Sequence, residues 1–222
     1  VPHSVGSATQ HRGWLLTHPL PLPDWRSSQH ESFYYLNLIA QLETILQATS
    51  KILDQTPVFD LAVTADQKAD AFKLLQAHGG RRENLIVALC PGSINSRAKR
   101  WPAERYAALA DRLIAEVGAT VLLIGSPGEL DVSQTVISKM RREPLLLTGQ
   151  TDLAQTAAVL SLVDLLVTND TGPAHIAAAL GRPALVIFGP TNPLTTRPLS
   201  PVVEILRQPP DCAPCMLRDC PI

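Results

Sequence analysis

The alternation of short apolar runs with helical patterns constrains the fold of this chain more than any other feature. Runs rich in Leu, Ile and Val lie at residues 85–90, 120–125, 145–149, 165–169 and 184–189. Strands that are apolar along their whole length are typical of a parallel sheet covered on both faces. Because parallel strands are joined by right-handed crossovers, the sequence predicts an α/β fold, Rossmann-like, with a parallel sheet covered by helices on both faces.

The segment after the first run shows the clearest helical pattern. Its apolar residues recur at helical spacing and form one face: Tyr106, Leu109, Ala110, Leu113, Ile114 and Val117. Pro102 and Gly118 bound this pattern, since proline favours the start of a helix and glycine its end. A second helix is predicted to begin with Thr151 as its N-cap.

Residues 1–56 lack this rhythm. They hold a proline-rich turn and one helical pattern over residues 30–49, and residues 51–60 suggest a linker. The sequence also begins without Met. We therefore interpret residues 1–56 as the closing part of a domain whose beginning is missing, and residues 57–222 as an α/β domain truncated at its end.

Composition excludes several classes of protein. A formal net charge of -1 shows no basic surplus of the kind that nucleic-acid binding needs. No apolar run reaches the roughly 18–20 residues that span a bilayer, and the first ten residues do not resemble a signal peptide. Without such a signal a reducing compartment is expected, so the four cysteines are not expected to form a disulfide framework.

The loops that follow the apolar runs are the candidate site, because ligands of open parallel sheets bind beyond the carboxyl ends of the strands. The first loop, residues 91–102, offers Ser93 and two cations, Lys99 and Arg100, just before a predicted helix. Loop N–H groups, a helix N-terminus and a nearby cation together can hold a phosphate. The alternative is a solvated basic loop, since runs of charge usually lie on the surface.

The second loop has the sequence NDTGPAH at residues 169–175. Gly172 lets a ligand approach the backbone closely, and Pro173 suits the first helical position. Asp170 would repel a bare phosphate, so it caps the helix, binds a sugar hydroxyl or lies near a counter-cation such as Lys99. His175 either donates to a phosphate or hydroxyl as a neutral imidazole or is an ordinary packing residue.

A third polar turn, FGPTNP at residues 188–193, follows the last apolar run. Gly/Pro turns with hydroxyl groups at three strand ends of one sheet together favour a ligand site more strongly than any one of them alone. The glycine-rich motifs typical of dinucleotide dehydrogenases and P-loop NTPases do not occur, nor does the nucleophile elbow of α/β-hydrolases.

Together these stretches resemble glycosyltransferase family 9. The likeness spans nearly all of the chain and rests on CPGSINSRAKRWP (90–102), GSPGE (125–129), TNDTGPAHIAAALGRPALVIFGPTNP (168–193) and CAPCMLRDCP (212–221). It implies the GT-B architecture of two Rossmann-like domains, of which the C-terminal one binds the sugar nucleotide. Residues 1–56 would then be the remnant of the N-terminal, acceptor domain with a linker helix, and residues 57–222 the nucleotide-sugar-binding domain.

The resemblance also implies a reaction: inverting transfer of a heptose from ADP-heptose to the inner core of lipopolysaccharide, without a cofactor. A lipid-linked acceptor implies a cytoplasmic protein that can associate peripherally with the inner face of the inner membrane. The alternatives are another nucleotide-sugar glycosyltransferase of GT-B fold, or a non-catalytic module that binds a nucleotide or a metal.

The donor-binding residues follow from the matching motifs. They are expected to contact the diphosphate (Ser93, Lys99, Thr171, Gly172), the diphosphate–heptose junction (Asp170, His175), the ribose hydroxyls (Glu129) and the adenine edge (Leu147, Thr148). A cation beside the diphosphate would stabilise the departing ADP by charge.

The general base proposed for this family is an acid near the start of the N-terminal domain, a part that is absent here. The acids within residues 1–56 are better explained as surface or helix charge: Asp24, Glu31, Glu43 and Asp54. We therefore predict that this chain alone binds nucleotide weakly and transfers no sugar.

The tail spaces three cysteines as C-x₂-C-x₄-C, at Cys212, Cys215 and Cys220. No metal is predicted, because a structural metal site normally closes with four ligands. These thiols are nevertheless the candidate ligands if a metal binds.

Overall fold

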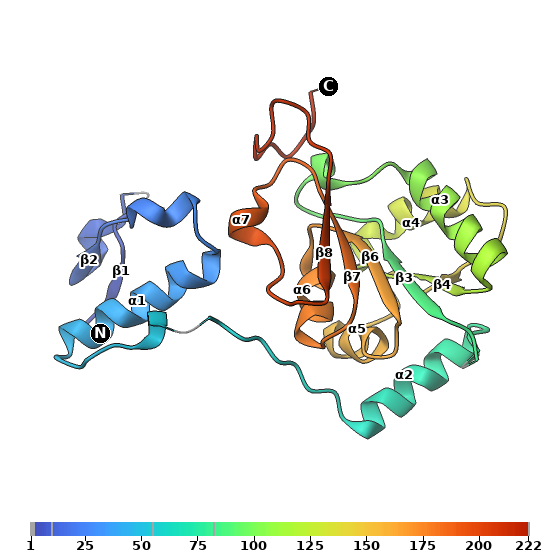
Figure 1. The fold of residues 1–222 in the computed structure, drawn as a ribbon, viewed down its shortest axis with the longest axis horizontal. Helices are drawn as coiled ribbons and strands as arrows, with labels where there is room; N and C mark the ends of the chain where they lie inside the picture. Colours follow the sequence, from blue (N-terminus) through green and yellow to red (C-terminus); the bar gives the residue numbers. More distant parts are fainter. Residues whose placement is uncertain (1–2, 10, 55, 82, 222) are drawn as a thin grey trace. The chain divides into compact units, whose positions relative to one another are not determined.

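The computed structural model describes residues 3–9, 11–54, 56–81 and 83–221, and Figure 1 shows their elements. The chain divides into two compact units. The smaller comprises Val1–Val58 and Pro193–Arg197, and the larger comprises Phe59–Asn192 and Pro198–Ile222. The first boundary, at Val58, lies inside the segment that the sequence suggests as a linker.

The smaller unit contains a short parallel ribbon and one long helix. Strand β1 (Val5–Ser7) pairs with β2 (His18–Leu20), and α1 (Glu31–Ile45) follows. The hydroxyl of Tyr34 on α1 donates to Ser7 Oγ at 2.6 Å, which ties the helix to the ribbon. The sequence predicts the helix but not the ribbon, since three-residue strands are too short to show an alternation.

The larger unit is built on six parallel strands. They are β3 (Ile86–Cys90), β4 (Thr120–Leu123), β5 (Leu145–Leu146), β6 (Leu165–Asn169), β7 (Ala184–Phe188) and β8 (Val203–Arg207). The helices along the chain are α2 (Ala65–Ala77), α3 (Ala103–Arg112), α4 (Leu130–Ile137), α5 (Leu153–Leu160), α6 (Gly172–Ala179) and α7 (Pro193–Thr196), the last grouped with the smaller unit. Short 3-10 turns precede two of them, η4 (Arg97–Lys99) and η6 (Pro127–Glu129), and a π turn, η5 (Leu113–Val117), ends the α3 region.

The strand order identifies where a ligand can bind. The sheet runs β5-β4-β3-β6-β7-β8, with every neighbouring pair parallel. The chain therefore builds outward from β3 to β5, returns to place β6 beside β3, and builds outward again to β8. This is the order of dinucleotide-binding folds, and the crevice of such a sheet opens where the direction reverses, here between β3 and β6.

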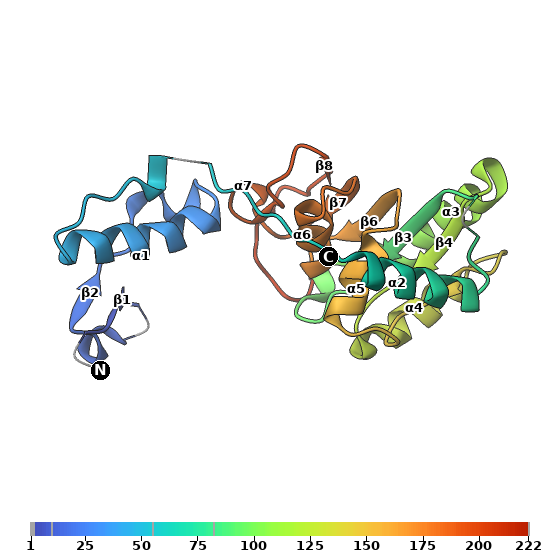
Figure 2. The same ribbon diagram turned by 90° about the horizontal axis from the view of Figure 1, so that it is seen from below.

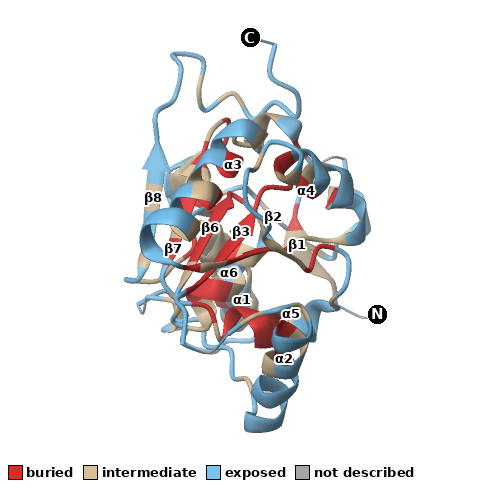
Figure 3. Cartoon of the chain, turned by 90° about the vertical axis from the view of Figure 1, so that its right-hand side faces the viewer, coloured by how far each residue is buried: buried red, intermediate tan, exposed pale blue. Residues whose placement is uncertain are grey.

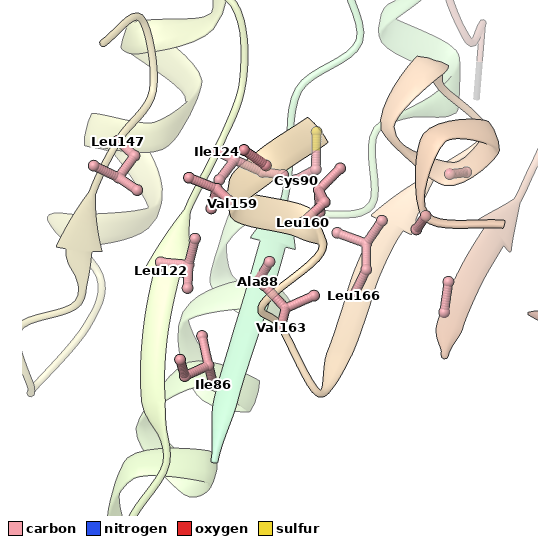
Figure 4. Close-up of a cluster of buried hydrophobic side chains, with 14 of the residues drawn as sticks. Ile86, Ala88, Cys90, Leu122, Ile124, Leu147, Val159, Leu160, Val163 and Leu166 are labelled. Atoms are coloured by element: carbon pink, nitrogen blue, oxygen red, sulfur yellow. The ribbon is translucent and has the colours of Figure 1, made fainter. Parts of the chain in front are cut away.

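Helices cover both faces of the sheet, as predicted. On β3 the side chains alternate: Ile86, Ala88 and Cys90 join the cluster beneath α2, α5 and α6 (Figure 4), whereas Val87 and Leu89 join the cluster beneath α3. Figure 3 shows the buried residues along β3, β6 and β7, and Figure 2 shows α2 alongside α5, with which it packs. A strand with both faces buried explains why the apolar runs do not alternate.

Three local predictions are corrected. The helix predicted from Thr151 is capped by Asp152, whose carboxylate accepts from the backbone N–H of Gln155 in a capping box. Pro102 is the N-cap of α3 rather than its first residue. Val117, placed on the buried helical face, is 54% exposed because the helix changes to a π turn before Gly118 ends it in a left-handed conformation.

No helix among the described residues is both long and apolar enough to cross a membrane.

Cys90 provides a test of the buried sheet. Burial, with the negative charge of Glu129 as a second cause, raises the pKa of the Cys90 thiol from 9.0 to about 12. A raised pKa favours the neutral thiol in the folded protein, so folding stability is unaffected below pH 9.0 and falls as the pH rises from there toward 12.

We expect iodoacetamide at neutral pH to alkylate the exposed Cys212 readily and Cys90 only after unfolding, as peptide mass spectrometry would show. Equal rates at both thiols would contradict the buried placement.

Candidate functional site

The candidate site lies at the carboxyl end of the sheet, at the reversal between β3 and β6. The loop after β3 contains η4 and Lys99, and the loop after β6 contains Asp170 and the start of α6. Each loop comes from a different strand end, so the sheet itself determines how they meet.

An ion pair joins these two loops. Lys99 Nζ lies 2.8 Å from Asp170 Oδ2 and donates a second hydrogen bond to the Asp170 carbonyl oxygen at 3.1 Å. Thr191, from the turn after β7, donates from Oγ1 to the same carboxylate oxygen at 2.7 Å. The Asp170 side chain is 4% exposed and the Lys99 side chain 24%, so the carboxylate is buried while the lysine side chain is partly exposed.

This geometry tests two of the three roles considered for Asp170; its contact with a sugar hydroxyl stays a prediction. The N-cap of α6 is Thr171, and no side chain caps that helix, so Asp170 is not its cap. The predicted proximity of Asp170 to a counter-cation is confirmed, with Lys99 as the cation. Thr171 Oγ1 hydrogen-bonds with Thr168 Oγ1 at 3.1 Å and donates to the Asn169 carbonyl oxygen.

Helix α6 begins at Gly172, with Pro173 as its second residue rather than its first. Gly172 is exposed, and a Cβ built there has no heavy atom within 4 Å. Packing of this chain alone therefore does not require glycine at this position. His175 is exposed on the first turn of the helix.

Asn169 is the main residue of the site that the sequence reading did not assign. Its Oδ1 accepts from Trp101 N at 2.9 Å and from the Tyr106 hydroxyl at 3.2 Å. Its Nδ2 donates to the carbonyl oxygens of Pro91 and Gly92 at 2.9 and 3.1 Å. All four hydrogen bonds of a fully buried amide are thus made, and they hold both ends of the loop after β3 against the end of β6.

Glu129, after β4, lies beside the same loop. It is buried, and its Oε2 accepts from the Ser126 backbone N–H and hydroxyl, both at 2.8 Å. A Cβ at Gly92 would lie 2.2 Å from Glu129 Oε1, and one at Gly125 would lie 3.2 Å from Oε2. The carboxylate therefore fills the space that a side chain at Gly92 would need and lies close to Gly125.

The remaining predicted residues have mainly structural contacts. Ser93 is buried, and its carbonyl oxygen accepts from Arg100 Nη2 at 3.0 Å. Leu147 packs in the core, and Thr148 Oγ1 hydrogen-bonds with Ser133 Oγ at 2.7 Å. The structure brings Ser93 and Lys99 into one loop; the predicted contact of Leu147 and Thr148 with an adenine stays a prediction.

Among the described residues, no group of three or more His, Cys, Asp or Glu side chains is arranged to hold a metal ion. Cys212, Cys215 and Cys220 form no disulfide bond in the described residues. At the reversal between β3 and β6 the structure places the Lys99 cation among hydroxyl, amide and carboxylate groups, an arrangement that can bind an anion.

Comparison with known proteins gives a consistent match. The sequence profile of "Glycosyltransferase family 9 (heptosyltransferase)" matches residues 20–222. Lipooligosaccharide heptosyltransferase 2 of Haemophilus influenzae is 36% identical over 161 residues, which is 69% of this chain and 46% of that protein. Lipopolysaccharide heptosyltransferase 2 of Escherichia coli is 36% identical over 129 residues, or 56% of this chain and 37% of that protein. This chain thus spans less than half the length of these relatives.

Solved structures agree with this match. The Escherichia coli ADP-heptose lps heptosyltransferase II superposes with a TM-score of 0.79 at 29% identity, over 94% of this chain and 62% of that one. A family 9 glycosyl transferase of Veillonella parvula superposes with a TM-score of 0.77 at 25% identity, over 94% of this chain and 57% of that one. The predicted GT-B fold class is confirmed.

Asn169 gives a test of how the loop after β3 is held. We expect Asn169→Ala to lower the free energy of unfolding by about 3 kcal/mol, because it leaves buried backbone groups without partners. Asn84→Ala is the control, since Asn84 makes one exposed hydrogen bond to Thr120, and a change within about 0.5 kcal/mol is expected. Urea denaturation measures both, and equal effects would show that the Asn169 contacts do not hold the loop.

Proposed function

The chain belongs to glycosyltransferase family 9, and on that premise we propose that its larger unit binds the nucleotide-sugar donor of a heptosyltransferase. The donor is ADP-heptose, and the reaction is inverting transfer of the heptose to the inner core of lipopolysaccharide. Two relatives named as a lipooligosaccharide and a lipopolysaccharide heptosyltransferase, and the structure of an ADP-heptose lps heptosyltransferase, support this assignment.

The single observation that carries the proposal is the position of Lys99. A protonated amine has three N–H donors, and Asp170 accepts two of them. The third remains for a ligand at the mouth of the β3–β6 crevice, where sugar-nucleotide phosphates bind in folds of this strand order. Because Asp170 also accepts from Thr191, the lysine is held from three strand ends.

Lys99 can promote the reaction through charge. When the bond between heptose and phosphate breaks, negative charge grows on the departing ADP. A cation already held at that place stabilises this charge without rearranging, which lowers the barrier. We assign the other donor contacts as the sequence suggests: Thr171 and Gly172 to the diphosphate, Asp170 and His175 to its junction with heptose, and Glu129 to the ribose.

Gly172 fits this role because packing does not explain it. A side chain at this position would meet no atom of the protein but would lie at the first residue of α6, where N–H groups lack helical partners. Close approach of a phosphate to the backbone is the remaining physical reason for a glycine.

For the acceptor we propose the lipid-linked inner core, reached at the inner face of the inner membrane by peripheral association. We assign no general base among the residues of this chain.

Lys99→Ala tests the donor assignment. We expect it to weaken ADP binding about 30-fold, the loss of one charged hydrogen bond, and to change AMP binding much less because AMP lacks the second phosphate. Lys73→Ala is the matched control: Lys73 is paired with Asp70 on the exposed face of α2, so ADP affinity should be unchanged. Isothermal titration calorimetry measures the affinities of the wild-type chain and of both variants for ADP and AMP.

Two outcomes would contradict the assignment. Equal losses for ADP and AMP would place Lys99 away from the diphosphate, and UDP binding tighter than ADP would favour a different nucleotide sugar.

A further inference from the structure

We infer that residues 216–219, here called the strap, position the turn that presents Lys99 to the donor diphosphate. The inference rests on the proposed function, since it assigns a second element to the same site. The strap lies between Cys215 and Cys220 in the sequence, far along the chain from the loop after β3, and neither its sequence nor the cysteine spacing indicates this contact.

Hydrogen bonds attach the strap to two of the site's loops. Ala98 N donates to the Arg218 carbonyl oxygen at 2.9 Å. Ser96 Oγ lies within hydrogen-bond distance of two strap carbonyl oxygens, at 3.3 Å from Leu217 and 3.1 Å from Arg218. Met216 N donates to the Pro190 carbonyl oxygen at 2.9 Å, so the strap also reaches the turn after β7.

An ion pair adds to these contacts. Arg97 Nε donates to Asp219 Oδ1 at 2.6 Å, and both side chains are largely exposed. The pair lowers the pKa of the Asp219 carboxyl from its ordinary value, the direct hydrogen bond from Arg97 being the larger cause. An exposed pair of this kind contributes little to stability, but here it joins the strap to the residue two positions before Lys99.

The turn that the strap contacts, η4, is one 3-10 turn of three residues, Arg97–Lys99. Its internal backbone hydrogen bonds run from Lys99 N to Ser96 O at 3.3 Å and from Arg100 N to Arg97 O at 3.0 Å. On one side the Ala98 N–H is taken by the strap. On the other side the Ala98 carbonyl oxygen lies against Gly189, where a built Cβ would be 3.3 Å away. Ala98 is therefore held from both sides, and Lys99 follows it directly.

The position of η4 matters because Lys99 would act on the diphosphate across a short distance. A misplaced cation binds and stabilises a diphosphate less well. The strap is thus a positioning element: it adds to the contacts of Lys99 with Asp170 by limiting where η4 can lie.

Two substitutions in the whole chain separate positioning from charge. Ser96→Ala removes a neutral hydroxyl that contacts the strap. Asp219→Ala removes a negative charge near the site, and this change in charge alone would tighten ADP binding. The variant also removes the ion pair between the strap and Arg97, and loss of that attachment would weaken ADP binding. We expect both variants to weaken ADP binding, Ser96→Ala by about fivefold, with less change for AMP.

Each variant has a matched control in the same unit. Ser161→Ala removes a buried hydroxyl that donates to the Ala158 carbonyl oxygen at the end of α5. Glu116→Ala removes the acid of another exposed ion pair, with Arg112. Neither should change ADP affinity, and a thermal unfolding scan of each variant checks that it is folded.

Exchange of the strap's backbone N–H groups gives a second test, because a contact that only stabilises the fold would not make this exchange depend on ADP. Coupling between two sites is reciprocal, so ADP should slow exchange of the Met216 N–H in the wild-type chain and have less effect in Ser96→Ala. Unchanged ADP affinity in both variants, or tighter ADP binding by Asp219→Ala, would overturn the positioning role of the strap. Failure of the wild-type chain to bind ADP would instead overturn the proposed function.

Discussion

The buried carboxylate of Asp170 is the constraint on which the rest of the site depends. Taking a carboxylate out of water is unfavourable by several kcal/mol unless a counter-charge and hydrogen bonds replace the solvent. Here a cation from the loop after β3 and a hydroxyl from the turn after β7 do so. Groups from three strand ends therefore meet at Asp170 Oδ2, which fixes the positions of the three loops relative to one another.

The loop after β3 can reach that position because its backbone is satisfied by other groups. Asn169 bonds to four partners around the loop, and Gly92 leaves room for the Glu129 carboxylate. Asn169 ends β6 and Gly92 follows β3 by two residues, so the parallel sheet acts as the common frame. The lysine is consequently held in a fixed orientation, and electrostatic catalysis by the proposed donor site requires such an orientation.

Much of this could be predicted from the sequence, and the remainder could not for identifiable reasons. Runs such as residues 86–90 are apolar throughout because both faces of the sheet are covered, and that pattern indicates a parallel sheet. Lys99 and Asp170 could be paired on chemical grounds alone, since each needs an opposite charge. The sequence does not single out Asn169, because it ends an apolar strand; a buried amide there requires partners, but their identity depends on tertiary structure.

The strap and the ribbon of the smaller unit could not be predicted because neither has a local signal. Strap contacts join the Ser96 hydroxyl and the Ala98 N–H to backbone carbonyl oxygens more than a hundred positions later, and a carbonyl oxygen is the same for every residue type. Caps are ambiguous for a different reason: Thr151 and Asp152 are both good N-caps, and only the capping box with Gln155 selects the second.

A double-mutant cycle on Lys99 and Asp170 tests most directly whether the ion pair is what prepares the site for a diphosphate. The free energy of ADP binding would be measured by calorimetry for the wild type, Lys99→Met, Asp170→Asn and the double variant. We expect Asp170→Asn to weaken ADP binding although it removes a negative charge, and to have almost no further effect once Lys99 is absent. Tighter ADP binding by Asp170→Asn, or losses that simply add in the double variant, would contradict the assigned role of the pair.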